Sequence, residues 1–251
     1  MMTPIEAITE ADLQALVEGG VPESRDLDYK RDAYGGRDDD KKEYLADISA
    51  LANTVGGHLV LGMDERDGVA SELVGCEIDP DKECLRLENL ARDGLQPRLQ
   101  GVRVRAIALE NGKRALLVRV PRSWSPPHRV VAQKSNRFWA RTDRQKYEPD
   151  VDQLRDLFAV APSIAEKIRD FWLHRLALIE SGEGLLGPDR SSGALVLHVV
   201  PYDSLRPGVR LSTEALSGLK VSPFKSSSWR SRLNSDGKLF HELPLRKSPV
   251  D

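Results

Sequence analysis

The chain lacks the motifs by which several common enzyme classes are recognised. Its 251 residues contain no G-x4-G-K-[ST] phosphate loop, no G-x-S-x-G nucleophile elbow and no H-E-x-x-H zinc motif. These absences count against a Walker-type ATPase, an α/β-hydrolase and a zinc hydrolase. Any catalysis would have to use a less familiar arrangement of side chains.

Cysteines and long apolar runs are also scarce. Cys76 and Cys84 are the only two cysteines, too few for a structural zinc site or a disulfide framework. No apolar run is long enough to cross a bilayer, and the first residues carry no apolar segment typical of a secretory signal. We therefore expect a cytoplasmic protein with reduced thiols and no membrane partner.

The formal net charge of -2 conceals a basic segment. Residues 102–146 contain twelve Lys and Arg against two Asp and Glu, so this segment carries +10 and the remainder of the chain -12. Such an asymmetry favours a local surface for phosphate groups, although solvent-facing strand positions would give the same count. A small, Ser-rich C-terminal part follows.

The stretch from Glu23 to Asp67 predicts a strand, a helix and a second strand. Residues 27–30 alternate apolar and polar, so Leu27 and Tyr29 should face the core and Asp28 and Lys30 the other side. From about residue 40 the apolar residues recur at helical spacing until Gly56-Gly57, and residues 58–62 form an apolar strand.

Acidic residues lie near the ends of these predicted strands. Glu23, Asp28 and Lys30 accompany the first strand, and Asp64 and Asp67 follow the second. Three carboxylates beside a lysine suit a Mg²⁺ or Mn²⁺ site that handles a phosphate, because hard cations take oxygen ligands. The alternative is that these charges are solvated strand ends.

The other expected elements complete an α+β fold, a mixed sheet with flanking helices, followed by a helix and a small C-terminal extension. We expect three domains or segments: an N-terminal helix (residues 1–21), a central domain (22–160) and a helix with an extension (161–251). The predicted helices and strands, in chain order, are helix 3–18, helix 81–91, strands 102–109 and 115–120 around an Asn111-Gly112 turn, strand 137–141, helices 149–158 and 163–180, and strand 194–200.

The segment D-I-S-A-L-A-N-T-V-G-G, preceded by E-x4-D-Y-K and followed by H-L-V-L-G, resembles the Schlafen AlbA_2 domain. That family, formerly described as a divergent AAA-like ATPase, includes many bacterial proteins assigned to nucleic-acid binding. The resemblance covers about residues 22–158. It implies the same α+β fold and a nucleic-acid partner.

Schlafen nucleases cleave RNA with two acids five residues apart, a third acid after the next strand and a lysine beside the second acid. The resemblance therefore implies Glu23, Asp28, Lys30 and Asp64 as catalytic residues, and the three acids among them as metal ligands. Two departures stand out: the second acid is Asp where Glu is usual, and Asp67 competes with Asp64 for the third position.

The basic segment supplies the candidate nucleic-acid contacts. Arg141 is the preferred phosphate contact, while Phe138 or Trp139 could stack on a base or pack in the core. The full set of candidate nucleic-acid-binding residues is Arg103, Arg105, Arg119, Arg122, His128, Arg137, Arg141 and Arg144.

Three hypotheses remain from the sequence. The first is a divalent-metal-dependent endoribonuclease, with RNA rather than DNA as partner. The second is a non-catalytic nucleic-acid-binding module, such as a transcriptional regulator or a nucleotide-sensing module. The third is a plain interaction domain. A sheet edge after Arg141 would also permit a homodimer. Binding follows from both charge and resemblance, whereas cleavage is the sharper claim.

Overall fold

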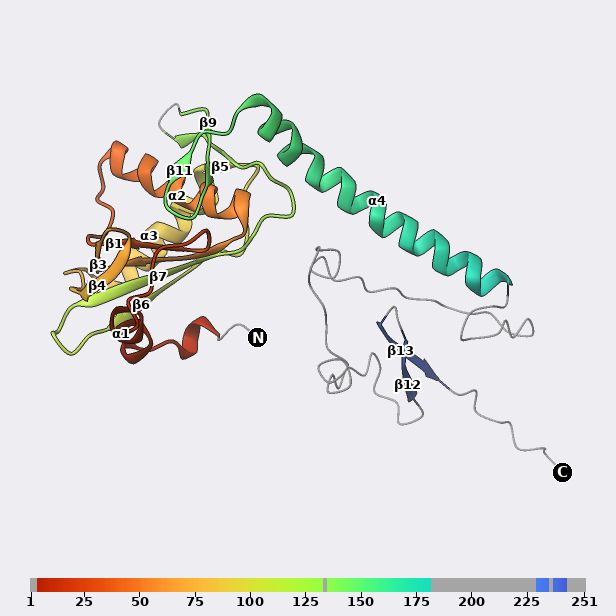
Figure 1. Cartoon of the computed structure of the whole chain (residues 1–251), viewed down its shortest axis with the longest axis horizontal. Coiled ribbons are helices and arrows are strands. Elements are labelled where there is room, and N and C mark those ends of the chain that lie inside the picture. The colour runs from red at the N-terminus through yellow and green to blue at the C-terminus, as the bar shows by residue number, and fades with distance from the viewer. Residues whose placement is uncertain (1–3, 133–134, 182–228, 235–236, 243–251) are drawn as a thin grey trace. The chain divides into compact units, whose positions relative to one another are not determined.

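The computed structural model of the chain describes residues 4–132, 135–181, 229–234 and 237–242. It divides into two compact units, Met1–Asp170 and Phe171–Asp251. The first unit is built on a central sheet, with helices α2 and α3 on one side and helix α1 on the other (Figure 1). Both faces of the sheet are therefore covered, as its apolar strands require.

The central sheet is mixed, as predicted. Its strand order is β1-β2-β7-β6; β1 and β2 are parallel, and the other neighbours are antiparallel. The parallel pair comes from the expected strand-helix-strand unit, and the antiparallel pair from the expected hairpin at Asn111-Gly112. The bounds are β1 Leu27–Lys30, β2 Gly57–Leu61, β6 Arg103–Ala108 and β7 Arg114–Val120.

Helix α2 (Asp38–Thr54) forms the centre of the larger apolar core. All ten residues from Tyr44 to Asn53 are buried, so the helix is covered on every side. It packs with α3 (Pro80–Asp93) against β2 and β7. Gly57 has φ 146°, and a Cβ there would lie 2.2 Å from the carbonyl oxygen of Asp26. Only glycine lets the helix turn into β2 this close to the chain before β1.

The N-terminal helix is shorter than predicted. A 3₁₀ turn, η1 (Ile5–Ala7), precedes α1 (Glu10–Glu18), and Ile8 between them is extended. Thr9 stops the helix from running further back, because its backbone N–H and hydroxyl both donate to the carboxylate of Asp12 at 2.8 Å. The second apolar core lies between α1 and the sheet.

Several short strands differ from the predicted elements. A hairpin of β3 (Met63–Arg66) and β4 (Val69–Leu73), with Gly68 in its turn, was not predicted. The expected strand 137–141 was wrong as one element, because it breaks at Trp139 into β9 (Arg137–Phe138) and β10 (Ala140–Arg141). β9 pairs with β8 (Arg129–Val130), which also pairs with β5 (Leu95–Gln96), and β10 pairs with β11 (Lys146–Tyr147).

Helix α4 (Val151–Ser181) is one element, so the predicted break between two helices was wrong. Pro162 lies inside it and removes one N–H from the hydrogen bonds of the helix. In the second unit, β12 (Trp229–Asn234) pairs with β13 (Gly237–Glu242). The predicted strand 194–200 lies outside the described residues. No helix in the described part of the chain is long and apolar enough to cross a membrane.

Candidate active site and basic surface

Asp28 and Arg141 form a buried ion pair between β1 and β10. Asp28 is 6% exposed and Arg141 3% exposed, and Arg141 Nη2 lies 3.1 Å from Asp28 Oδ1. The same Nη2 donates to the carbonyl of Leu27 at 3.4 Å. Among the described residues, Arg141 Nε has no hydrogen-bond partner. Arg141 therefore holds Asp28 in place, and the phosphate contact predicted for it stays a prediction that would require it to leave this pair.

Glu23 and Lys30 complete the surroundings of Asp28. Lys30 Nζ lies 2.9 Å from Asp28 Oδ2, and Glu23 Oε1 accepts the backbone N–H of Tyr29 at 3.0 Å. Burial raises the pKa of Glu23, and the charge of Asp28 and a side-chain hydrogen bond with it act in the same direction. Burial opposes the charged form of Lys30, but the carboxylates of Asp47, Asp28 and Glu23 together raise its pKa. The structure thus brings together three of the four predicted catalytic residues.

Asp47 belongs to the same cluster and was not predicted. It lies in the middle of α2, 4% exposed, where Lys146 Nζ contacts its Oδ1 at 2.7 Å and Tyr34 donates to its Oδ2. Burial raises the pKa of Asp47, against the lowering effect of Lys146 and Lys30. We call Glu23, Asp28, Asp47, Lys30, Arg141 and Lys146 the charge cluster. An acid inside an otherwise apolar helical run was the available sequence signal.

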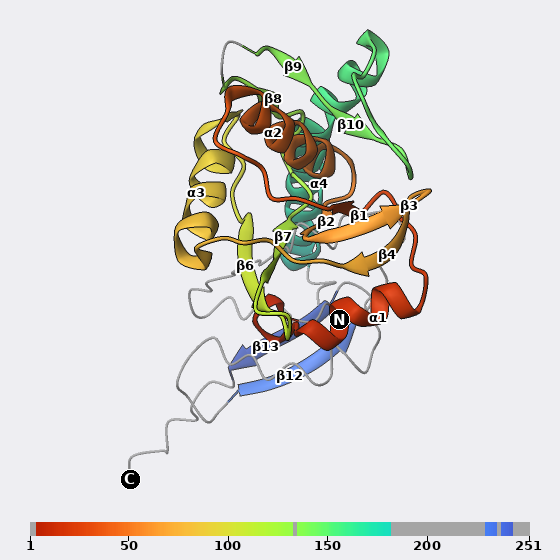
Figure 2. The same cartoon turned by 90° about the vertical axis from the view of Figure 1, so that its left-hand side faces the viewer.

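Asn53, six residues further along α2, ties two loops to the helix. Its Nδ2 donates to the carbonyls of His128 at 3.2 Å and Trp139 at 2.9 Å, and its Oδ1 accepts the N–H of His128 at 2.7 Å. Trp139 directly precedes β10, which carries Arg141. Figure 2 shows β10 beside α2. The position of Arg141 in the charge cluster thus depends on an amide in the centre of the fold.

A hollow of about 440 Å³ opens beside Glu23. Pro22, Glu23, Glu65, Asp67, Gly68, Val69 and Arg144 line it. Asp67, at the tip of the β3–β4 hairpin, has φ 54°. The hollow brings one predicted nucleic-acid contact, Arg144, to the same place as one predicted catalytic acid, Glu23. Of the two candidates for the third acid, Asp67 lines this hollow together with Glu23, and Asp64 is not among its lining residues.

The three predicted metal ligands do not come together in the expected form. Asp28 Oδ2 is buried with Lys30 Nζ 2.9 Å away, and the carboxylates of Glu23 and Asp28 are close enough to interact, so the pair offers oxygen ligands of the kind that a hard cation takes. Asp64, however, forms an ion pair with Arg31. Within the described residues, no three His, Cys, Asp or Glu side chains are arranged to hold a metal. Two of the three carboxylates fit a metal site, and the third does not.

A second group of basic residues lies on the opposite face of the sheet. His58, Arg119 and Arg103 stand side by side on β2, β7 and β6, because they are partners in the strand register. We call these three residues the basic row. Arg119 Nε donates to His58 Nε2 at 2.9 Å, and burial, followed by the charge of Arg119, lowers the pKa of His58. Successive side chains of a strand point to opposite faces of the sheet, and that of Asp28 points away from the face of the basic row. The basic row and the charge cluster are therefore separate surfaces.

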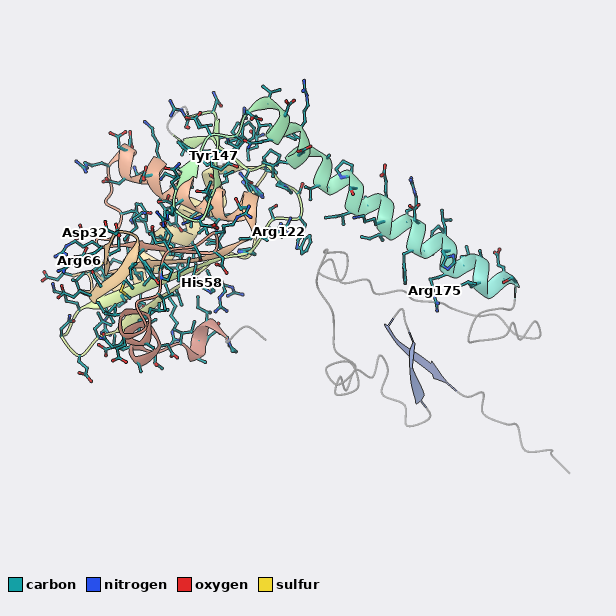
Figure 3. All side chains as sticks on the ribbon, in the orientation of Figure 1. Asp32, His58, Arg66, Arg122, Tyr147 and Arg175 are labelled. Atoms are coloured by element: carbon teal, nitrogen blue, oxygen red, sulfur yellow. The ribbon has the colours of Figure 1, made fainter. Side chains whose placement is uncertain are left out.

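The remaining predicted contacts are distributed over the first unit. Arg105 lies on the face of the basic row and donates to the carbonyl of Ile5, while Arg137 pairs with Glu148 at 2.9 Å. His128 is 2% exposed, with Nε2 2.7 Å from Ser123 Oγ and Nδ1 2.6 Å from the carbonyl of Pro97. Arg122 follows the end of β7; Figure 3 labels it, together with His58. As placed, His128 and Arg141 are interior residues.

Comparison with known proteins identifies one family. The family model described as Schlafen, AlbA_2 matches residues 23–150. No curated protein was found to match the chain. Among solved structures, the N-terminal domain of a protein related to the ATP-dependent DNA helicase RecG, from Nitrosomonas europaea, matches with a TM-score of 0.41 and 22% identity, over 57% of this chain and 93% of that one.

A second solved structure, the DIP2311 protein from Corynebacterium diphtheriae, matches with a TM-score of 0.38 and 16% identity. This match covers 56% of the present chain but 29% of the length of that one. Neither likeness is close enough to carry an argument about the chemistry of the site.

Proposed function

The chain belongs to the Schlafen AlbA_2 family, and from that membership we propose that its first unit binds nucleic acid. The family suggests a function related to nucleic acid, but it does not say which surface of the chain binds the nucleic acid. We propose the basic row as that surface, with the phosphate backbone as the group recognised.

The observation that supports this surface is the direct opposition of Arg103 and Arg119 across β6 and β7. Like charges in that position repel, and the repulsion is relieved when an anion lies between them. Arg103 is exposed and, among the described residues, has no ion pair. Two guanidinium groups and an imidazole side by side are suited to the oxygens of a phosphate backbone.

Replacing Arg103 or Arg119 with glutamine should weaken nucleic-acid binding. Each lost phosphate contact should also reduce the slope of log K against log salt by about 0.9 for a duplex or about 0.7 for a single strand. The measurement is fluorescence anisotropy of labelled RNA and DNA, single-stranded and duplex, over a salt series. We expect RNA to be preferred over DNA.

Arg92→Gln is the matched control, since Arg92 is an exposed arginine on α3, on the other side of the sheet, and pairs with Asp93. It should change neither affinity nor slope. Binding that is absent at every salt concentration, or equal in all variants, would contradict the basic row as the contact surface. Complete absence of binding would instead favour an interaction domain with a different partner.

The finer proposal is that the domain is also a divalent-metal-dependent endoribonuclease, supported by the contact between Glu23 and Asp28 with Lys30 beside them. A bound Mg²⁺ or Mn²⁺ would activate water and stabilise the charge that develops on the scissile phosphate. Of the chain's own residues, Glu23 and Asp28 would hold the ion, Lys30 and Arg144 would neutralise phosphate charge, and Arg141 would keep Asp28 oriented.

Glu23→Gln is the sharpest variant for testing cleavage. Burial raises the pKa of Glu23, so folding disfavours its charged form relative to the neutral one; glutamine is neutral, and its amide oxygen can still accept the Tyr29 N–H. Removing a charge whose burial is unfavourable at pH 7 should leave stability unchanged or raised. We therefore expect cleavage of labelled tRNA and single-stranded RNA in Mg²⁺ or Mn²⁺, no cleavage in EDTA, and no cleavage by Glu23→Gln.

Asp64→Asn and Asp67→Asn, tested in parallel, identify the third acid. Asparagine tolerates the positive φ of residue 67, so neither change should unfold the chain. Loss of cleavage in Asp67→Asn alone would assign that role to the residue beside Glu23. Nucleic-acid binding without cleavage in any ion would refute the nuclease and leave the non-catalytic module.

A further inference from the structure

An apolar hollow of about 280 Å³ lies between α1 and the sheet, next to the basic row. Leu27, Val60 and Leu117 come from the strands, and Ile8, Leu13 and Leu16 from the N-terminal segment and α1. His58, Arg119 and Asp12 are its polar lining residues. The space is small compared with pockets for drug-sized ligands and suits a compact molecule.

One carboxylate and two arginines set the charge on the polar side of this hollow. The carboxylate of Asp12 accepts hydrogen bonds from the N–H and hydroxyl of Thr9, which lower its pKa and keep it charged. Burial and Arg119 lower the pKa of His58, so at neutral pH the imidazole is uncharged and accepts the Arg119 Nε–H. Arg119 therefore brings the positive charge, and Arg103, opposite it on β6, adds a second one at the same register.

The geometry points to a binding site for a small amphiphilic anion: a medium-chain aliphatic group in the hollow and a carboxylate on Arg119 and Arg103. An aliphatic chain would match a lining made mostly of leucine, isoleucine and valine and would leave no polar atom unsatisfied. A nucleobase fits this lining poorly, because its hydrogen-bonding edge would be buried against aliphatic side chains. The carboxylate would relieve the repulsion between the two opposed arginines.

Isothermal titration of the full chain with sodium octanoate at pH 7.4 tests this site. We expect saturable binding of one equivalent, no binding of octanol, which lacks the charge, and no binding of adenosine monophosphate, which lacks the aliphatic chain. Leu16→Gln and Arg119→Gln should each weaken octanoate binding by about tenfold or more, because one removes the apolar wall and the other the charged contact.

Two exposed residues on α3 provide matched controls. Leu85 is 60% exposed and Arg92 pairs with Asp93, so Leu85→Gln and Arg92→Gln should bind octanoate like the unchanged chain. Melting curves for each variant establish that it is folded. The proposal is overturned if octanoate shows no saturable binding, if octanol or adenosine monophosphate binds equally well, or if folded Leu16→Gln and Arg119→Gln bind octanoate as the controls do.

Arg119 also belongs to the basic row, so an octanoate carboxylate and a nucleic-acid phosphate should exclude each other there. This competition rests on the proposed function, whereas direct titration with octanoate does not. Leu16→Gln separates the two, since it should lose octanoate binding and retain nucleic-acid binding. Failure of nucleic-acid binding in the unchanged chain would leave the octanoate result standing by itself.

Discussion

Asp28→Ala is expected to lower the free energy of unfolding by about 3–5 kcal/mol, because it leaves a buried cation without its counter-charge. Arg141 is 3% exposed, and Asp28 is the acid that pairs with it. Lys30 loses its contact with Asp28 Oδ2 as well. Urea denaturation at pH 7 measures the change. Arg141→Ala should show a smaller loss, since Lys30 still pairs with the buried Asp28.

The double variant Asp28→Ala/Arg141→Ala should lose less than the sum of the two single variants, because each single change already breaks the pair. Asp64→Ala is the control: Asp64 and Arg31 also pair, but their side chains are 30% and 56% exposed. A pair in solvent should contribute within about 1 kcal/mol. A loss of that small size for Asp28→Ala would show that Arg141 finds another partner.

Stability also bears on any test of catalysis. A variant at Asp28 that stops RNA cleavage could do so simply by loosening β10 from β1. Glu23→Gln avoids this problem, because Glu23 is joined to β1 through the Tyr29 N–H and has no contact with Arg141 among those described. Activity measurements at Asp28 are interpretable only beside its denaturation curve.

Asn53→Ala is expected to lower the free energy of unfolding by about 3 kcal/mol, because two buried backbone groups and one half-buried group lose their partner. The carbonyls of His128 and Trp139 and the N–H of His128 have their hydrogen bonds to this one side chain. Asn53→Asp should be at least as harmful at pH 7, since a carboxylate would face two carbonyl oxygens. Its effect should shrink as the pH falls and the carboxyl becomes protonated. Urea denaturation over a pH series measures both.

Asn111→Ala is the matched control, because it removes a side-chain amide of the same kind from the turn between β6 and β7. Its side chain also makes two backbone hydrogen bonds, to the carbonyl of Val74 and the N–H of Lys113. Asn111 is exposed, so water can replace both, and the loss should stay within about 1 kcal/mol. Equal effects at residues 53 and 111 would mean that the loops after β7 do not depend on α2.

The sequence predicted those elements whose period is long or whose turn chemistry is strong. The alternation in residues 27–30, the helical spacing before Gly56-Gly57 and the Asn111-Gly112 turn gave the four strands of the sheet and helix α2. The short β3–β4 hairpin was missed because β3 is mostly polar and both strands are short, although Asp67-Gly68 is a dipeptide that favours such a turn. Local sequence pattern therefore predicted the strands of the central sheet but little of the short strands around it.

The candidate site was harder to predict, because pairing across the fold decides what each charge does. Arg141 looks like a surface arginine in the sequence and becomes interior only through Asp28, a partner 113 residues away. Asp47 looks like a polar break in an apolar helix, and its cation, Lys146, is 99 residues away. Conversely, Arg103 and Arg119 were both predicted to bind nucleic acid, but their direct opposition follows only from the strand register.

Protein synthesis gives these long separations an order in time. Asp28 and Asp47 leave the ribosome early, whereas Arg141 and Lys146, which neutralise them, follow about a hundred residues later. Until β10 and β11 emerge, the nascent chain holds two acids at positions that are buried in the finished domain. Contacts of such separation form slowly. Arg141 and Lys146 therefore become available to their acids only in the last stage of translating this domain.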